Sequence, residues 1–140
     1  MPRTPKEILE TYRSWAVVGL SDDPARDSHR VASFLADRGY RIVPVNPRIE
    51  SWQGEKAYPD LLTIPVPVEV VDLFRRPEEV PAHVDEAIRI GAKAVWMQLG
   101  VVHAEAAARA EAAGLTVIRD RCPLIETRTL WPAGDGPRFD

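Results

Sequence analysis

The strongest constraint on the fold is a regular alternation between short apolar runs and amphipathic helical segments. Residues 14–20 form an apolar run that stops at Gly19-Leu20, which is typical of a strand buried in a parallel sheet. Further strands are predicted at 40–45, 68–74, 94–99 and 115–118. Helices are predicted at 5–12, 28–38, 77–90, 103–113 and 123–130, the first with Thr4 as its N-cap.

Strands that alternate with helices at these spacings form βαβ units, which build a mostly parallel sheet. We therefore predict an α/β fold, a Rossmann-like doubly wound sheet with helices on both faces, in a single domain over 1–140. The core is expected at about 14–130, and the tail 132–140 is expected to be frayed. The pattern is weakest between 48 and 67, where we predict a short edge strand near 53–57 and one helical turn at 59–62.

The size and charge of the chain exclude several classes of protein. With 140 residues, 45% of them hydrophobic, the chain can form one domain with an ordinary core. No apolar run approaches the roughly 20 residues of a membrane span, and the N-terminus lacks a signal-peptide core, so we expect a cytoplasmic protein without membrane contact. The formal net charge is −3 and no basic stripe appears, so nucleic acid is not an expected partner. A protein partner or a homodimer is left open.

The first loop that could hold a ligand is 19–28, because ligands of doubly wound sheets bind at the carboxyl ends of the strands. Gly19 allows a tight turn, and free backbone N–H groups at the start of the next helix favour a phosphate. Arg26 can add a charged contact, and the hydroxyls of Ser21 and Ser28 can donate hydrogen bonds. The competing interpretation is that Ser28 only caps the helix and that the loop is a solvated turn.

The end of the second predicted strand carries the second signal. An NAD-binding fold places Asp or Glu there to accept hydrogen bonds from the ribose hydroxyls. This chain has Asn46-Pro47-Arg48 instead. A neutral amide followed by an arginine suits a ribose that bears a phosphate, as in coenzyme A or NADP. The alternative is an ordinary Asn-Pro turn followed by a surface arginine.

A series of short segments in a fixed order resembles the coenzyme A-binding domain family, whose stand-alone members are relatives of the N-terminal domain of the succinyl-CoA synthetase α subunit. The segments are Val17-Val18-Gly19-Leu20-Ser21, Gly39-Tyr40, Val43-Pro44-Val45-Asn46-Pro47, Val71-Asp72-Leu73-Phe74-Arg75, Trp96-Met97-Gln98-Leu99-Gly100 and Asp120-Arg121-Cys122. The resemblance runs from about Trp15 to Glu126. Each segment is weak alone, and their order and spacing make the series specific.

The resemblance implies a role for each segment in binding coenzyme A. It implies that Gly19, Ser21 and Arg26 in the first loop bind the pyrophosphate. It implies that Asn46, Pro47 and Arg48 bind the end of the adenosine that carries the 3′-phosphate. Further along the chain, the resemblance implies that Phe74, Arg75 and Pro77 line the adenine. It also implies that Gln98 and Gly100 lie near the pantetheine. Arg76 stands where many relatives have proline, which leaves open which of the two arginines reaches the ligand.

We therefore expect a module that binds coenzyme A or an acyl-CoA, as a carrier, sensor or partner subunit rather than as an enzyme. The synthetase α subunit carries a second domain with a phosphorylatable histidine, and this chain ends before such a domain. One alternative is a small NADP-dependent reductase, although the chain has no Tyr-x-x-x-Lys pair and no glycine-rich fingerprint. Another is the coenzyme A-binding half of a split acyl-CoA ligase.

The remaining reactive side chains give no catalytic or metal-binding pattern. The three histidines are scattered, and none has the spacing of a metal ligand pair. The single cysteine, Cys122, cannot form an internal disulfide. We interpret it as a small buried residue at the start of a helix; the alternative is a thiol near the sulfur of the coenzyme, able to form a mixed disulfide.

Overall fold

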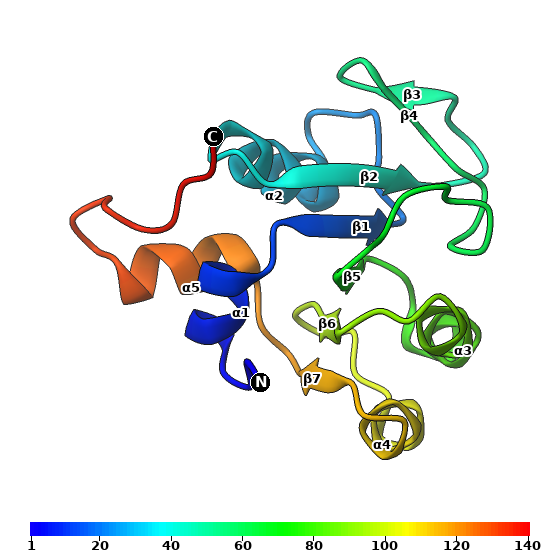
Figure 1. Ribbon diagram of the computed structural model, residues 1–140. Coiled ribbons are helices and arrows are strands. Elements are labelled where there is room, and N and C mark those ends of the chain that lie inside the picture. The colour runs from blue at the N-terminus through cyan, green and yellow to red at the C-terminus, as the bar shows by residue number, and fades with distance from the viewer.

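The protein is an α/β sandwich built on one parallel sheet, seen in a computed structural model that describes residues 1–140 (Figure 1). The five strands of this sheet lie in the order β2-β1-β5-β6-β7, and every neighbouring pair is parallel. Their bounds are β1 Ser14–Val18, β2 Arg41–Val45, β5 Val70–Leu73, β6 Ala94–Met97 and β7 Thr116–Ile118. The predicted doubly wound fold is confirmed.

Helices cover both faces of the sheet, as predicted. Helices α1 (Pro5–Thr11), α2 (Asp27–Asp37) and α5 (Pro123–Leu130) pack on one face, and α3 (Val80–Arg89) and α4 (Ala104–Ala112) pack on the other (Figure 1). Alternate residues of each strand point to opposite faces, so Trp15 and Val17 join the first layer while Ala16 and Val18 join the second. The apolar runs are continuous because both faces are buried.

The first helix begins where the sequence places it. The Thr4 hydroxyl accepts a hydrogen bond from the Glu7 backbone N–H at 3.2 Å, and the Glu7 carboxylate accepts one from the Thr4 N–H at 3.1 Å. This reciprocal capping box satisfies two N–H groups that the helix leaves unpaired. Ile8 and Leu9 are buried beneath it, which anchors α1 over the sheet.

The segment between β2 and β5 differs from the prediction. The expected edge strand near 53–57 is a separate antiparallel hairpin, β3 (Ser51–Trp52) with β4 (Glu55–Lys56). Only Tyr58, just after the hairpin, pairs with the main sheet, through an isolated parallel bridge to Val45. The expected helical turn at 59–62 is a series of bends, because the Asp60 carboxylate accepts the Thr63 N–H at 2.9 Å and closes a local turn. A short 3₁₀ turn, η1 (Pro77–Glu79), also precedes α3.

The C-terminal tail was expected to be frayed, but its end packs against the domain. The tail returns from α5 to the side of α2 (Figure 1). The Phe139 N–H donates to the Arg38 carbonyl at 2.8 Å, and the Phe139 ring meets the edge of Tyr40 with centroids 4.9 Å apart. An aromatic contact and a backbone hydrogen bond thus hold the end of the chain. No helix of the protein has both the length and the apolar character that a membrane crossing requires.

One buried carboxyl group interrupts the apolar interior. Asp72 lies on the central strand β5, is fully buried, and has no hydrogen-bond partner for either carboxylate oxygen. Burial raises the pKa of the Asp72 carboxyl well above its ordinary value, because a charge without partners is costly in a medium of low polarity. The folded protein therefore holds the protonated acid under conditions in which the unfolded chain ionises.

Replacement of this acid tests its protonation state. Because the pKa of Asp72 is raised in the folded state, the free energy of unfolding of the wild type is highest below about pH 4. It falls as the pH rises towards the folded pKa, by up to about 1.4 kcal/mol per pH unit. Asp72→Asn removes that dependence. In urea unfolding between pH 4.5 and 8, the free energy of unfolding of the variant is expected to rise relative to that of the wild type as the pH increases, up to the folded pKa of Asp72. The exposed Asp135→Asn is the control. A constant difference between Asp72→Asn and wild type across this range would contradict a protonated Asp72.

Candidate functional site

All five parallel strands end at the same edge of the sheet, and their following loops enclose one large pocket. The order of the strands reverses at β1, which pairs with β2 on one side and with β5 on the other. The chain continues from β1 towards β2 and from β5 towards β6, so the loops after β1 and β5 diverge beyond their first residues and leave a space between them. The pocket at this point has a volume of about 1110 Å³. Small-molecule sites in proteins typically span roughly 300–1,000 Å³.

The loops after β1 and β5 touch at Gly19. Gly19 has a φ of +85°, and its N–H donates to the Val45 carbonyl at 2.7 Å. A Cβ atom at this position would lie 2.2 Å from the carbonyl oxygen of Phe74. Both the left-handed backbone and the close approach require glycine. The predicted role of Gly19 in a tight turn thus has a second cause, which the sequence does not reveal.

Hydrogen bonds within the loop after β1 hold its shape. The Ser28 hydroxyl oxygen accepts from the Ser21 N–H at 3.0 Å, and the Ser21 hydroxyl oxygen accepts from the Asp23 N–H at 3.0 Å. Helix α2 begins at Asp27, one residue before the predicted start, and Arg26 is its N-cap without a capping side-chain bond. Ser28 is therefore a buried residue that stabilises the loop, and it is not the N-cap of α2. The N-terminus of α2 faces the pocket with Arg26 exposed beside it.

Asn46 fastens the loop after β2 to the loop after β1. Its side-chain N–H donates to the Leu20 carbonyl at 3.0 Å, and its side-chain oxygen accepts from the Arg48 N–H at 3.0 Å. Asn46 is nearly buried, so both ends of its amide are engaged inside the protein. Arg48 follows as an exposed side chain on the pocket wall without an ion-pair partner. In this geometry Asn46 positions Arg48.

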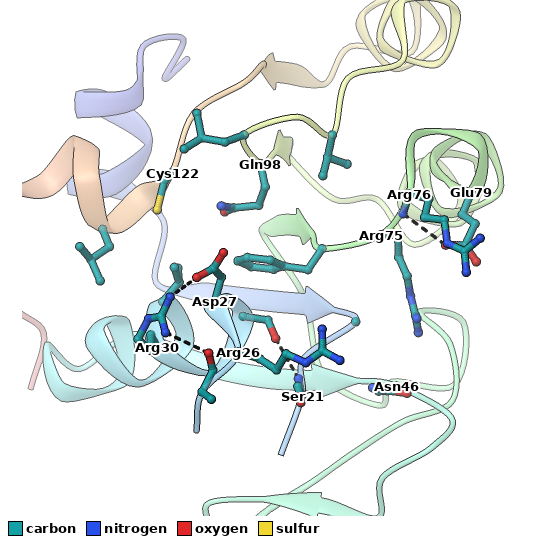
Figure 2. Close-up of a pocket in the computed structure, with 18 of the residues that line it drawn as sticks. Ser21, Arg26, Asp27, Arg30, Asn46, Arg75, Arg76, Glu79, Gln98 and Cys122 are labelled. Carbon is teal, nitrogen blue, oxygen red and sulfur yellow. Dashed lines mark hydrogen bonds and ion pairs between the residues drawn. The ribbon is translucent and has the colours of Figure 1, made fainter. Parts of the chain in front are cut away.

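The structure distinguishes the two arginines that follow β5. Arg75 is half-buried, has no acidic partner, and points across the pocket (Figure 2). Arg76 lies on the outer side, with its guanidinium 4.0 Å from the Glu78 carboxylate and its backbone N–H donating to Glu79 at 3.3 Å. Both arginines line the pocket, and Arg75 is the one that is half-buried and has no ion-pair partner.

The charge of the pocket is opposite in sign to that of the chain. Five arginines and three acids line it, a net of +2, whereas the whole chain carries −3. Asp27 and Arg30 neutralise one another in an ion pair. The unpaired positive groups Arg26, Arg48 and Arg75 line the pocket together with the N-terminus of α2, which adds its own positive dipole. This end of the pocket attracts anions.

The other end of the pocket is formed mainly by uncharged side chains, and the Asp27–Arg30 ion pair lies on its α2 side (Figure 2). Gln98, which follows β6, is 5% exposed, and its side-chain oxygen has no hydrogen-bond partner. Cys122 is buried at the N-cap of α5, and Figure 2 shows its sulfur and the Gln98 amide pointing into the same part of the pocket. An unpaired buried amide oxygen is costly, so a ligand that donates a hydrogen bond to it would bind favourably.

Ten of the twelve residues singled out from the sequence line this single pocket: Gly19, Ser21, Arg26, Ser28, Asn46, Arg48, Phe74, Arg75, Pro77 and Gln98. Pro47 and Gly100 do not. Gly100 instead donates its N–H to the Asp120 carboxylate at 2.8 Å and so joins the loops after β6 and β7.

Sequence reasoning missed the apolar part of the lining, which consists of side chains from four separate segments: Val31, Ile49, Leu99, Val101, Leu124 and Ile125. For Ile49, Leu99 and Val101 the available signal was a large apolar residue in a loop that follows a strand, where a polar residue is usual. The other three residues lie in helices, where an apolar residue gives no such signal. No group of three or more His, Cys, Asp or Glu side chains is placed to hold a metal ion.

A family model described as a CoA binding domain matches residues 13–128. An uncharacterized protein of Bacillus subtilis, YneT, is 44% identical over 117 residues, which cover 84% of this chain and 87% of that protein. The solved structure of a hypothetical protein from Pyrococcus horikoshii is 42% identical, with a TM-score of 0.88, over 90% of this chain and 89% of the other.

The same fold recurs inside a larger enzyme. In the dinucleotide-forming acetyl-coenzyme A synthetase 1 of Ca. Korarchaeum cryptofilum, a region similar to 79% of this chain makes up 26% of that chain, with a TM-score of 0.69 and 24% identity. At this identity the likeness concerns the fold alone.

Addition of one methyl group at Gly19 tests the close approach between the loops after β1 and β5. Gly19→Ala is expected to lower the free energy of unfolding by the cost of a left-handed alanine, about 1–2 kcal/mol, plus about 1–3 kcal/mol for the overlap with Phe74. The matched control is Gly54→Ala, since Gly54 has a φ of +82° but nothing within 4 Å of the added atom. Urea unfolding measures both variants. Equal losses would show that no close approach exists at Gly19.

Proposed function

This chain belongs to the CoA-binding domain family, and we propose from that premise that it is a module that binds coenzyme A or an acyl-CoA in the pocket at the carboxyl edge of the sheet. The observation that carries the proposal is the division of the pocket into a positively charged end and an uncharged end. Coenzyme A has the same division, because its three phosphate groups lie at the nucleotide end and its pantetheine arm is neutral.

The charged end offers separate partners for separate phosphates. We place the pyrophosphate at the loop 19–28, where the first N–H groups of α2 and the Arg26 guanidinium can bind it. Arg48, held in place by Asn46, is the partner that we assign to the 3′-phosphate. These assignments agree with the expectations from the sequence, except that Asn46 acts through Arg48 because its own amide is engaged.

The middle and the far end of the pocket suit the rest of the molecule. Phe74 and Pro77 line the wall beside Arg75, and an apolar surface next to a guanidinium is a suitable support for the adenine ring. Gln98 lies further along, and we assign its unpaired oxygen to an amide N–H of the pantetheine. The lining contains no histidine or lysine, so we propose a carrier, sensor or partner module rather than an enzyme.

Isothermal titration with coenzyme A tests the proposal, with NADP as the comparison ligand. We expect saturable binding of coenzyme A and weaker binding of NADP. Arg48→Ala and Arg75→Ala should each weaken binding about 10- to 150-fold, because a hydrogen bond between charged groups contributes about 1.5–3 kcal/mol. Arg41→Ala is the control, since Arg41 is exposed at the opposite end of β2. Absence of coenzyme A binding at millimolar concentration would contradict the proposal.

Dephospho-coenzyme A, which lacks only the 3′-phosphate, tests the assignment of Arg48. The wild type should bind it more weakly than coenzyme A. Arg48→Ala should bind the two ligands almost equally, since the arginine and the phosphate are each other's partner. An undiminished preference for coenzyme A in Arg48→Ala would place the 3′-phosphate elsewhere.

A further inference from the structure

The uncharged end of the pocket leaves large apolar side chains in contact with solvent. Six side chains form this end: Gln98, Leu99, Val101, Cys122, Leu124 and Ile125. None of them carries a charge. Leu99 is 55% exposed and Ile125 is 49% exposed, and both belong to the small set of large apolar side chains that this protein leaves in contact with solvent.

Apolar side chains gathered inside a pocket indicate a ligand group that covers them. Leu99 and Val101 come from the loop after β6, and Leu124 and Ile125 from the first turn of α5. They converge on one cavity from separate parts of the chain, and this cavity continues into the charged end near Gly19. A ligand whose phosphates occupy the charged end can therefore place its other end among these apolar side chains.

Gln98 determines which part of a coenzyme A ligand reaches the apolar end. Its buried oxygen has no partner and can accept only from a donor such as an amide N–H. In the pantetheine arm the last amide nitrogen is separated from the sulfur by two carbon atoms. A hydrogen bond from that amide to Gln98 therefore brings the sulfur, and any acyl group on it, among the neighbouring apolar side chains (Figure 2).

We propose that the uncharged end, formed by Gln98, Leu99, Val101, Cys122, Leu124 and Ile125, is a subsite for an apolar acyl group carried as a thioester of coenzyme A. This inference rests on the proposed binding of coenzyme A and specifies its ligand class. A saturated acyl chain covers Leu99 and Ile125 and removes them from water. An acyl group that ends in a carboxylate finds no cation among these six side chains and loses hydration there.

The test compares the affinities of the full-length protein for free, acetyl-, butyryl-, hexanoyl- and succinyl-coenzyme A by isothermal titration. Affinity should increase about fourfold for each methylene that becomes buried, up to the length that fills the subsite. Succinyl-coenzyme A should bind no more tightly than acetyl-coenzyme A. Tighter binding of the succinyl ligand, or equal affinities for all acyl lengths, would overturn the subsite.

Two exposed positions provide the variants. Leu99→Ser combined with Ile125→Ser should reduce the ratio between the affinities for hexanoyl- and acetyl-coenzyme A towards one. Leu62→Ser is the matched control, because Leu62 is 44% exposed but lies outside the pocket, and it should preserve the wild-type ratio. A wild-type ratio in the double variant would overturn the inference.

The two proposals fail in different ways. Binding of free coenzyme A without any dependence on acyl length overturns the subsite and leaves the binding module intact. Absence of binding for every one of these ligands, free coenzyme A included, overturns both.

Discussion

The arrangement of the binding edge depends on how closely the loops after β1 and β5 approach each other. Adjacent parallel strands bring these loops together at the point where the strand order reverses, and the contact of Gly19 with the Phe74 carbonyl leaves no space for a side chain. The hydrogen bonds of Gly19 to Val45 and of Asn46 to Leu20 join the loop after β2 to the same point. Three loops are thus held together by backbone contacts and by the Asn46 side chain before any ligand binds, which lowers the entropy cost of binding.

The two ends of the pocket contribute different properties to recognition. Unpaired arginines and the N-terminus of α2 attract phosphate groups over a distance, and they favour any ligand with that charge. The apolar end has no such reach, and the proposed subsite there acts only on groups that come into contact with it. In the proposed complex the loops after β1, β2 and β5 recognise the phosphates, and the loops after β6 and β7 with α5 recognise the acyl group.

Hydrophobic periodicity and capping signals were sufficient to predict the main sheet and its helices from the sequence. The apolar runs and the Thr4 cap are local features of the chain. The hairpin at Trp52 and the turn at Asp60 were predicted wrongly, since the outcome there depends on a buried tryptophan and on a side chain that competes for a backbone N–H. The choice between Arg75 and Arg76 depended on side-chain direction, which adjacent sequence positions do not specify. The apolar end combines segments distant in sequence, so only the folded structure reveals it.

The central claim is that coenzyme A lies along this edge, with its phosphates at α2 and its sulfur near Cys122. A crystal structure of the protein with bound coenzyme A tests it most directly. We expect the pyrophosphate against the N–H groups of residues 19–28, the 3′-phosphate within hydrogen-bond distance of Arg48, and the pantetheine amide on Gln98. Coenzyme A bound at another surface, or in the reverse direction with its sulfur beside Arg48, would contradict this placement.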